Sequence, residues 1–266
     1  MWKRLATGVT LAPLVLAAAW FLPTTLGVLM VVVAAALAAY EFLSMFSIRS
    51  SRLLFYGGLV WIILVPVAAR FGGHWLFVHL MVSPLCIMGL FLLVPERLDS
   101  AVKEMPVLAL GVLYVGLLMA TVVMLAMLPG GNSGLLLLFA VVWLGDTAAY
   151  FGGKSLGRRK LYARVSPKKT LEGSFFGLLG SVLGAFLVDA VWGTPLSWYW
   201  LVVAGVAGGV AEQAGDLCES LLKRSAGIKD SGSILPGHGG MLDRIDGLLF
   251  GAPVIYGIYL VALGGF

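Results

Sequence analysis

Nine apolar runs, each long enough to cross a lipid bilayer, limit what this chain can fold into. A membrane-spanning helix needs about 17–25 mostly apolar residues. The runs lie at 5–22, 24–46, 53–70, 75–94, 106–128, 134–152, 172–191, 197–217 and 247–265. They lack the alternation of barrel strands and are longer than such strands. We therefore expect an all-α, polytopic integral membrane protein with about nine transmembrane helices.

The composition points the same way. Of 266 residues, 60% are hydrophobic and 12% are charged, whereas soluble chains are about 45–50% apolar and about 25% charged. This excludes an ordinary cytosolic enzyme, a disordered tail and a secreted mini-protein. Cys86 and Cys218 form neither a disulfide framework nor a CxxC metal pattern. The net charge of +5 indicates membrane topology and anionic lipids or phosphates, with no nucleic-acid partner.

The positive charges predict an orientation. If the N-terminus is cytoplasmic and nine spans alternate, all of the 18 Lys and Arg residues except Arg70 lie in cytoplasmic segments, as the positive-inside rule requires. The first run also has features of a secretory signal, but the second run follows after a very short turn, so we expect an uncleaved hairpin. We predict a multi-pass protein of the cytoplasmic (inner) membrane, with its N-terminus in the cytoplasm.

The two halves of the chain differ in chemistry. Residues 1–133 carry few acids, and we interpret them as N-terminal transmembrane helices that act as a scaffold. Among these acids, Glu41 is expected to be interfacial. Residues 134–266 are interpreted as the C-terminal transmembrane helices that carry the catalytic site.

The first polar segment of the C-terminal half runs from Gly152 to Gly173. Its second part, Ser166-Pro-Lys-Lys-Thr-Leu-Glu-Gly, combines a proline-fixed turn with glycines that permit close backbone approach. We expect Lys168 or Lys169 to contact a ligand. A P-loop is rejected, because Ala148 stands at the required first glycine and a membrane helix precedes the segment.

Acidic residues in this half follow helical spacing. Glu212, Asp216, Glu219 and Lys223 are 4, 3 and 4 residues apart and share one helix face. Asp243 and Asp246 also share a face, and the Gly/Pro-rich turn before them suits an anion nest. Carboxylates beside Lys and Arg clusters favour Mg²⁺ with phosphates. Asp146 lies inside an apolar run, where an ionisable group is costly and is a functional candidate.

These residues resemble the signature of the phosphatidate cytidylyltransferase (CDP-diglyceride synthetase) family. The signature reads Ser220-Leu-Leu-Lys-Arg, four residues, Lys229-Asp230, then Pro236-Gly-His-Gly-Gly-Met-Leu-Asp-Arg-Ile-Asp246. Further matches lie upstream at Trp143–Asp146, Ser166–Gly173 and Gln213–Asp216, so the resemblance covers roughly residues 143–250 without a departure. It implies that CTP and phosphatidic acid give CDP-diacylglycerol and pyrophosphate. It also implies a requirement for Mg²⁺, a monovalent cation such as K⁺ beside it, and a homodimer.

Roles for individual residues follow from a reaction between two anions, in which cations must offset repulsion. The expected metal ligands are Asp216 and Asp243, supported by Asp246 and Asp146. The expected catalytic residues are Asp216, Asp243, Asp246, Lys223, Arg244 and His238. The expected substrate-binding residues are Ser166, Lys168, Lys169, Ser220, Arg224 and Lys229. CTP, phosphatidic acid and membrane lipids are the expected partners, and the active site is expected at the cytoplasmic face.

Two other classes of membrane protein fit the sequence less well. A CDP-alcohol phosphatidyltransferase would require Asp-Gly-x-x-Ala-Arg, but Asp246-Gly247 is followed by Leu-Leu-Phe. An ion-coupled transporter could use Asp146 and Asp216 as ion ligands. Such a transporter would place acids near mid-membrane in several spans, whereas these acids cluster at one face.

Overall fold

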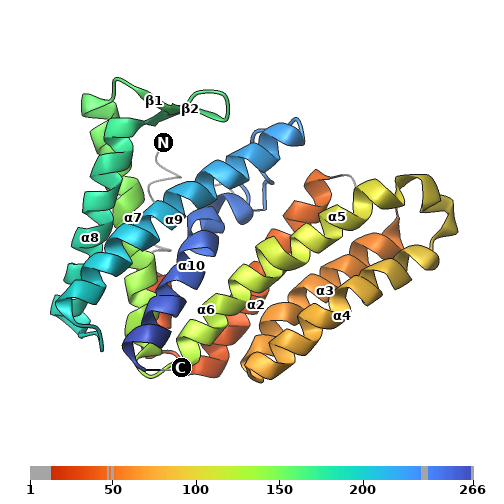
Figure 1. The fold of residues 1–266 in the computed structure, drawn as a ribbon, viewed down its shortest axis with the longest axis horizontal. Coiled ribbons are helices and arrows are strands. Elements are labelled where there is room, and N and C mark those ends of the chain that lie inside the picture. Colours follow the sequence, from red (N-terminus) through yellow and green to blue (C-terminus); the bar gives the residue numbers. More distant parts are fainter. Residues whose placement is uncertain (1–12, 47, 49–50, 235–238, 265–266) are drawn as a thin grey trace. The chain divides into compact units, whose positions relative to one another are not determined.

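The computed structural model describes residues 13–46, 48, 51–234 and 239–264. Within these residues eight helices are long and apolar enough to cross a membrane (Figure 1), which confirms the polytopic, all-α architecture. The expected first span, 5–22, lies partly outside the described residues, although residues 13–21 are helical. The number nine therefore stays a prediction.

The helices follow the apolar runs closely. Their bounds are α2 (Thr24–Met45), α3 (Arg52–Arg70), α4 (Gly73–Leu92), α5 (Ala101–Gly111), η3 (Val112–Leu117), α6 (Leu118–Met127), α7 (Gly131–Leu156), α8 (Leu171–Trp192), α9 (Trp198–Ser225) and α10 (Leu242–Ala262). A short 3₁₀ helix, η2 (Pro95–Ser100), precedes α5, and η3 is a π-helical stretch within one continuous span. The main difference is at α9, which continues to Ser225 because its polar last turns are good helix formers that hydropathy does not count.

A small antiparallel hairpin was not expected in the polar segment between α7 and α8. Strand β1 (Lys160–Tyr162) pairs with β2 (Ser166–Thr170), and Lys160 lies opposite Thr170. Thr170 is also the N-cap of α8, because its Oγ1 accepts a hydrogen bond from the Gly173 N–H at 3.1 Å. The Glu172 carboxylate accepts the backbone N–H groups of Arg158 and Arg159. The hairpin is therefore tied to the first turn of α8.

The chain divides into two compact units. Unit 1 contains the described parts of Met1–Gly27, Leu125–Ser225 and Ile245–Phe266, and unit 2 contains Val28–Met124 and Ala226–Arg244. The segment from Ala226 to Arg244 thus packs with helices of the N-terminal half. The predicted division at residue 133 concerns where the chemistry lies, and it stays a prediction.

Small residues let the helices of unit 1 approach closely. A Cβ built on Gly180 of α8 would lie 2.5 Å from both the Leu144 carbonyl oxygen and the Ala148 Cβ of α7. A Cβ on Gly205 of α9 would lie 2.5 Å from the Val182 Cα of α8. Glycine at such contacts is typical of membrane helix pairs. This packing fixes α7, α8 and α9 against one another and so fixes the polar ends that they carry.

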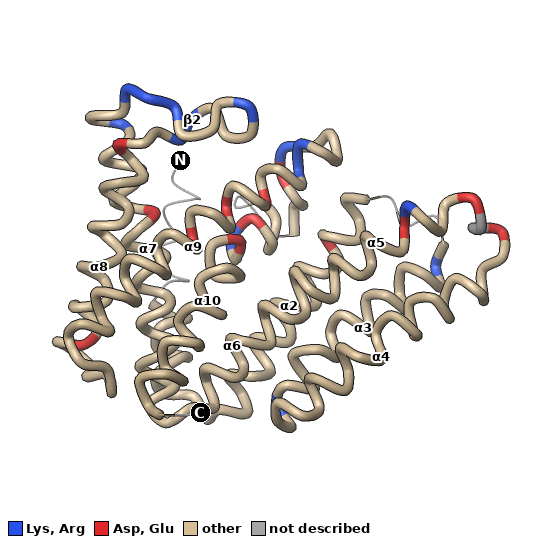
Figure 2. Tube along the Cα trace, viewed as in Figure 1, with Lys and Arg blue, Asp and Glu red and all other residues tan. Residues whose placement is uncertain are grey.

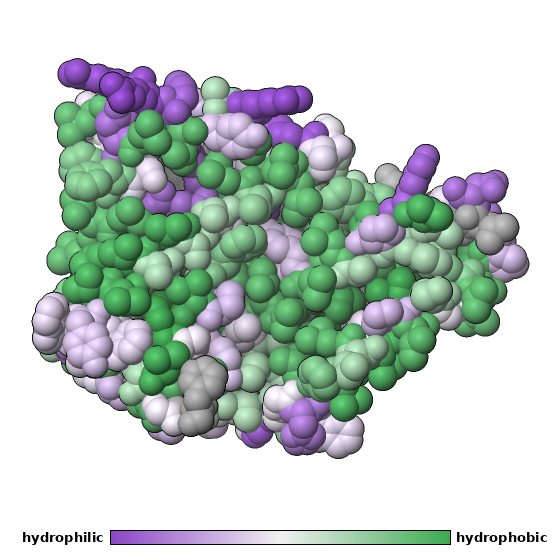
Figure 3. Space-filling model, viewed as in Figure 1, coloured by the Kyte–Doolittle hydropathy of each residue, from purple (hydrophilic) through white to green (hydrophobic). Residues whose placement is uncertain are grey.

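Apolar side chains cover the outer surface of the helices. Phe175 and Leu183 of α8 are 60% and 66% exposed, and hydrophobic residues dominate the sides of the helices in Figure 3. Hydrophilic residues gather instead over the hairpin and the helix ends (Figure 3). So large an exposed apolar surface is suited to lipid rather than to water.

Candidate active site

The charged residues of unit 1 gather at one end of its helices. Among those that the structure describes, all except Asp189 belong to residues 158–170, to the first turn of α8, to the first two turns of α10, or to the second halves of α7 and α9. Figure 2 shows this concentration of blue and red around β2 and along the last turns of α9. Antiparallel connection explains it, because α7 ends and α8 begins on either side of the same hairpin.

A short ion pair joins the hairpin to α9. The Lys169 Nζ lies 2.6 Å from Asp216 Oδ2, and the two side chains are 25% and 28% exposed. Lys168 is exposed, since successive strand residues point to opposite sides. The Ser220 hydroxyl donates to Asp216 Oδ1 at 3.3 Å. Of the two expected lysines, Lys169 is the one that joins the acids, and Ser166 occupies the start of the same strand.

A second ion pair lies one turn further along α9. Glu219 is fully buried and pairs with Lys223, four residues on, whose side chain is 12% exposed. Arg224 is exposed in the last turn of the helix. The shared helix face expected for Glu212, Asp216, Glu219 and Lys223 is thus present in α9.

Further acids approach this face from α7 and α10. Glu212 and Asp146 share a side-chain hydrogen bond, and the charges of Lys169 and Asp216 also act on Glu212. Asp246 is under the electrostatic influence of Asp216, Asp146 and Lys223. Its Oδ1 accepts the Gly247 N–H at 2.8 Å. Unit 1 therefore brings together six of the expected site residues, namely Asp146, Lys169, Asp216, Ser220, Lys223 and Asp246.

Glycines make this close approach possible. A Cβ on Gly215 of α9 would lie 2.6 Å from the Asp246 carbonyl oxygen. A Cβ on Gly247 of α10 would lie 2.9 Å from Glu212 Cγ. Larger residues at either position would push α9 and α10 apart, and the acids with them.

Two contacts were not anticipated from the sequence. The Gln213 amide donates to the Ser174 carbonyl oxygen at 3.1 Å and accepts from the Ser174 hydroxyl. Glu212 is 1% exposed and contacts Asp146. The helical spacing of Glu212 could have indicated that it lies near the other acids. No pattern in the sequence indicated a role for Ser174.

The expected residues Asp243, Arg244 and Lys229 belong to unit 2. Asp243 Oδ2 accepts the backbone N–H groups of Ser231 at 3.1 Å and Gly240 at 2.9 Å, which orients its carboxylate. Arg244 and Lys229 are exposed. His238 lies outside the described residues.

The donor set suits an open magnesium site rather than a closed cage. Among the described residues, no three His, Cys, Asp or Glu side chains are grouped to hold a metal ion. Asp216 nevertheless supplies hard oxygen donors close to Glu212, and Asp246 supplies further ones close to Asp216. Because Mg²⁺ is commonly held by one or two carboxylates, with water and substrate phosphates completing its shell, these residues fit it.

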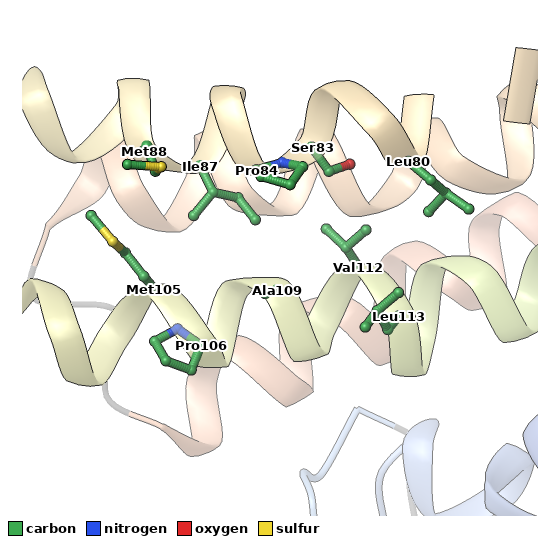
Figure 4. Close-up of a pocket in the computed structure, with 10 residues that line it drawn as sticks. All are labelled: Leu80, Ser83, Pro84, Ile87, Met88, Met105, Pro106, Ala109, Val112 and Leu113. Carbon is green, nitrogen blue, oxygen red and sulfur yellow. The ribbon is translucent and has the colours of Figure 1, made fainter. Parts of the chain in front are cut away.

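An apolar cavity in unit 2 has a different character. It has a volume of about 300 Å³ and lies between α4 and the α5–η3 segment (Figure 4). Met88 and Met105 face each other at one end, and Leu80 and Leu113 line the other (Figure 4). The Ser83 hydroxyl at its wall already accepts from Trp61 Nε1 and donates to the His79 carbonyl oxygen, each at 2.8 Å. The cavity therefore offers no group for phosphate or metal chemistry.

Comparison with known proteins shows which family the chain is similar to. The sequence model of the cytidylyltransferase family matches residues 2–262. A phosphatidate cytidylyltransferase of Brucella suis is 47% identical over 128 residues, which is 48% of this chain and 47% of that protein. The phosphatidate cytidylyltransferase of Synechocystis is 46% identical over 139 residues, covering 51% of this chain and 45% of that protein. That of Bacillus subtilis is 46% identical over 123 residues, covering 46% and 45%. The chain thus spans about half the length of the curated relatives it matches.

Proposed function

Because this chain belongs to the cytidylyltransferase family, we propose that it transfers CMP from CTP to phosphatidic acid, a step of phospholipid biosynthesis. The products would be CDP-diacylglycerol and pyrophosphate. A lipid phosphate and a soluble nucleotide have to meet at the membrane surface, and the charged end of unit 1 is suited to that meeting.

The observation that carries this proposal is the contact between Lys169 and Asp216 at 2.6 Å. It sets a cation that can bind phosphate directly beside a carboxylate that can bind metal. Asp146, Glu212 and Asp246 add negative charge around it. Such alternation of cation and carboxylate suits a metal-bound polyphosphate more than a structural ion pair, which needs only two partners.

The proposed reaction is an in-line displacement at phosphorus. An oxygen of the lipid phosphate forms a bond to the α-phosphorus of CTP, and the bond from that phosphorus to the β-phosphate oxygen breaks. Pyrophosphate leaves with the bonding electrons. Since phosphate is already a nucleophile, the chain needs to supply little proton chemistry. Its main task is to bind, align and neutralise two anions.

The cations of the site have two different proposed roles. Lys169 and Lys223 lie among the acids and would contact phosphates at the reacting centre. Lys168 and Arg224 are exposed and would attract CTP or lipid headgroups. Further proposed substrate contacts are Ser166, Ser220, Lys229 and Arg244. His238 is proposed to contact a phosphate or an acid.

The proposed metal is Mg²⁺, held by Asp216 and Asp246 with Asp146 in support. Asp243 is also a proposed ligand, because it shares a face of α10 with Asp246. When bound, Mg²⁺ would stabilise charge on the α-phosphate and on the leaving pyrophosphate. A monovalent cation such as K⁺ beside it, and a homodimer, are part of the same proposal. We also propose that the protein lies in the inner membrane and that its site faces the cytoplasm, where CTP is available.

The proposal is tested by pyrophosphate release from the purified chain in detergent. Release should require CTP, Mg²⁺ and phosphatidic acid together, and it should stop when EDTA is added or when diacylglycerol replaces phosphatidic acid. A phosphatidyltransferase would release CMP from CDP-diacylglycerol instead, and a transporter would release no pyrophosphate. Absence of release under these conditions would refute the proposal.

A further inference from the structure

Glu41 is a buried acid in α2, within unit 2, where the sequence suggested an interfacial residue. It is 2% exposed. Its Oε2 accepts two hydrogen bonds, from the Ser231 hydroxyl at 3.1 Å and from the Leu242 backbone N–H at 2.9 Å. Leu242 is the first residue of α10, so the carboxylate binds one of the unpaired N–H groups at a helix N-terminus.

The surrounding backbone is shaped around this carboxylate. A Cβ on Gly240 would lie 2.5 Å from Glu41 Oε2, and a Cβ on Gly232 would lie 2.8 Å from Glu41 Cδ. Any side chain at either glycine would displace the carboxylate. Burial of a charged group is costly unless hydrogen bonds compensate for it, and here both compensating donors come from the segment that precedes Asp243.

Ser231 connects Glu41 with Asp243. Its hydroxyl donates to Glu41, while its backbone N–H donates to Asp243 Oδ2 at 3.1 Å. Gly240 N–H donates to the same Asp243 oxygen at 2.9 Å. Ser231 therefore meets one carboxylate through its side chain and the other through its backbone. A shift of Ser231 would turn the Asp243 carboxylate.

We propose that Glu41 is a positioning residue that fixes Ser231 and the first turn of α10, and thereby the direction of the Asp243 carboxylate. It acts through these backbone groups and contacts no substrate. The inference rests on the proposed function for its effect on turnover, because Asp243 is a proposed metal ligand. Its structural part, the anchoring of α10 by Glu41, is independent of any reaction.

Two variants separate positioning from general stability. Glu41→Gln keeps an oxygen acceptor at the same reach and should retain most of the anchoring. Glu41→Ala removes the acceptor and leaves the Ser231 hydroxyl and the Leu242 N–H without it. Glu96→Ala, at an exposed acid in η2, is the matched control.

The first measurement is hydrogen–deuterium exchange over residues 231–246 in the 266-residue chain. Glu41→Ala should lose protection in this segment, whereas Glu41→Gln and Glu96→Ala should resemble wild type. The second measurement is turnover against Mg²⁺ concentration. Glu41→Ala should lower kcat at least about 10-fold and raise the Mg²⁺ concentration for half-maximal rate, and Glu41→Gln should restore both towards wild type.

The outcomes distinguish the two proposals. Wild-type exchange in Glu41→Ala would overturn the inference, and so would an unchanged kcat and Mg²⁺ dependence in folded Glu41→Ala protein. A wild-type chain that shows no turnover would count against the proposed function alone, since exchange at 231–246 still decides whether Glu41 anchors α10.

Discussion

Lys169 on the β2 strand and Asp216 on α9 form an ion pair of 2.6 Å, and this contact joins the basic hairpin to the acidic face of unit 1. Both side chains are partly exposed. The cation and the carboxylate of this pair are the two groups on which the proposed binding of phosphate and metal rests.

The first prediction compares neighbouring lysines. Lys169→Met should lower kcat/KM for CTP at least about 10-fold, which is about 1.4 kcal/mol of barrier, because it removes the cation among the acids. Lys168→Met should have an effect several times smaller, since Lys168 is exposed on the other side of the strand. Steady-state kinetics of both variants in detergent would check this. Equal losses would contradict the distinction between the two lysines.

The second prediction concerns the carboxylate of the same pair. Asp216→Asn keeps the size of the side chain but removes its charge, and it should lower turnover at least about 100-fold, or about 2.7 kcal/mol. Asp230→Asn, at an exposed acid, is the control and should be much milder. Rates are to be measured at low and saturating Mg²⁺. A near-normal rate in folded Asp216→Asn protein would remove Asp216 from the proposed metal site.

The spans could be predicted from the sequence because length and apolarity alone determine whether a helix can cross a bilayer. The face of α9 could be predicted for a similar reason, since helical spacing fixes which of Glu212, Asp216 and Lys223 are neighbours. The hairpin could not be predicted. Residues 158–170 are basic and lack apolar alternation, so their pairing depends on Glu172 and on the fold around them.

Contacts between residues far apart in the chain also could not be predicted from the sequence. Glu41 and Ser231 are 190 positions apart, and neither lies in a motif that indicates the other. The choice between Lys168 and Lys169 depends on the phase of a strand that was not expected. In the sequence, glycines such as Gly180 cannot be distinguished from the other residues of an apolar run. In the structure, they determine how closely the helices pack.

The third prediction tests that packing. In Gly180→Ala, the new methyl group would lie 2.5 Å from the Leu144 carbonyl oxygen, so α7 and α8 must move apart. We expect a destabilisation of about 1–3 kcal/mol, as for other overpacked contacts. Gly257→Ala in α10 is the control, because nothing lies within 4 Å of its Cβ position. Thermal unfolding in detergent should show a lower Tm for Gly180→Ala only, and equal Tm values would contradict the packing argument.

The fourth prediction concerns orientation. The hairpin should face the cytoplasm and the end of α3 should face the opposite side. Single cysteines at Tyr162→Cys and Phe71→Cys, both exposed positions, would be introduced after Cys86 and Cys218 are replaced by serine. An impermeant thiol reagent added to intact cells should label Phe71→Cys and should label Tyr162→Cys only after lysis. Labelling of Tyr162→Cys in intact cells would reverse the predicted topology.

In the proposed reaction, the lipid phosphate attacks the α-phosphorus of CTP. The most direct measurement supplies the purified chain with phosphatidic acid and CTP that carries ³²P at either the α or the γ position. Label from the α position should enter the lipid fraction, and label from the γ position should leave entirely as pyrophosphate. Transfer of the γ label into lipid would mean that the chain moves the terminal phosphate as a kinase does, and it would refute the proposed reaction.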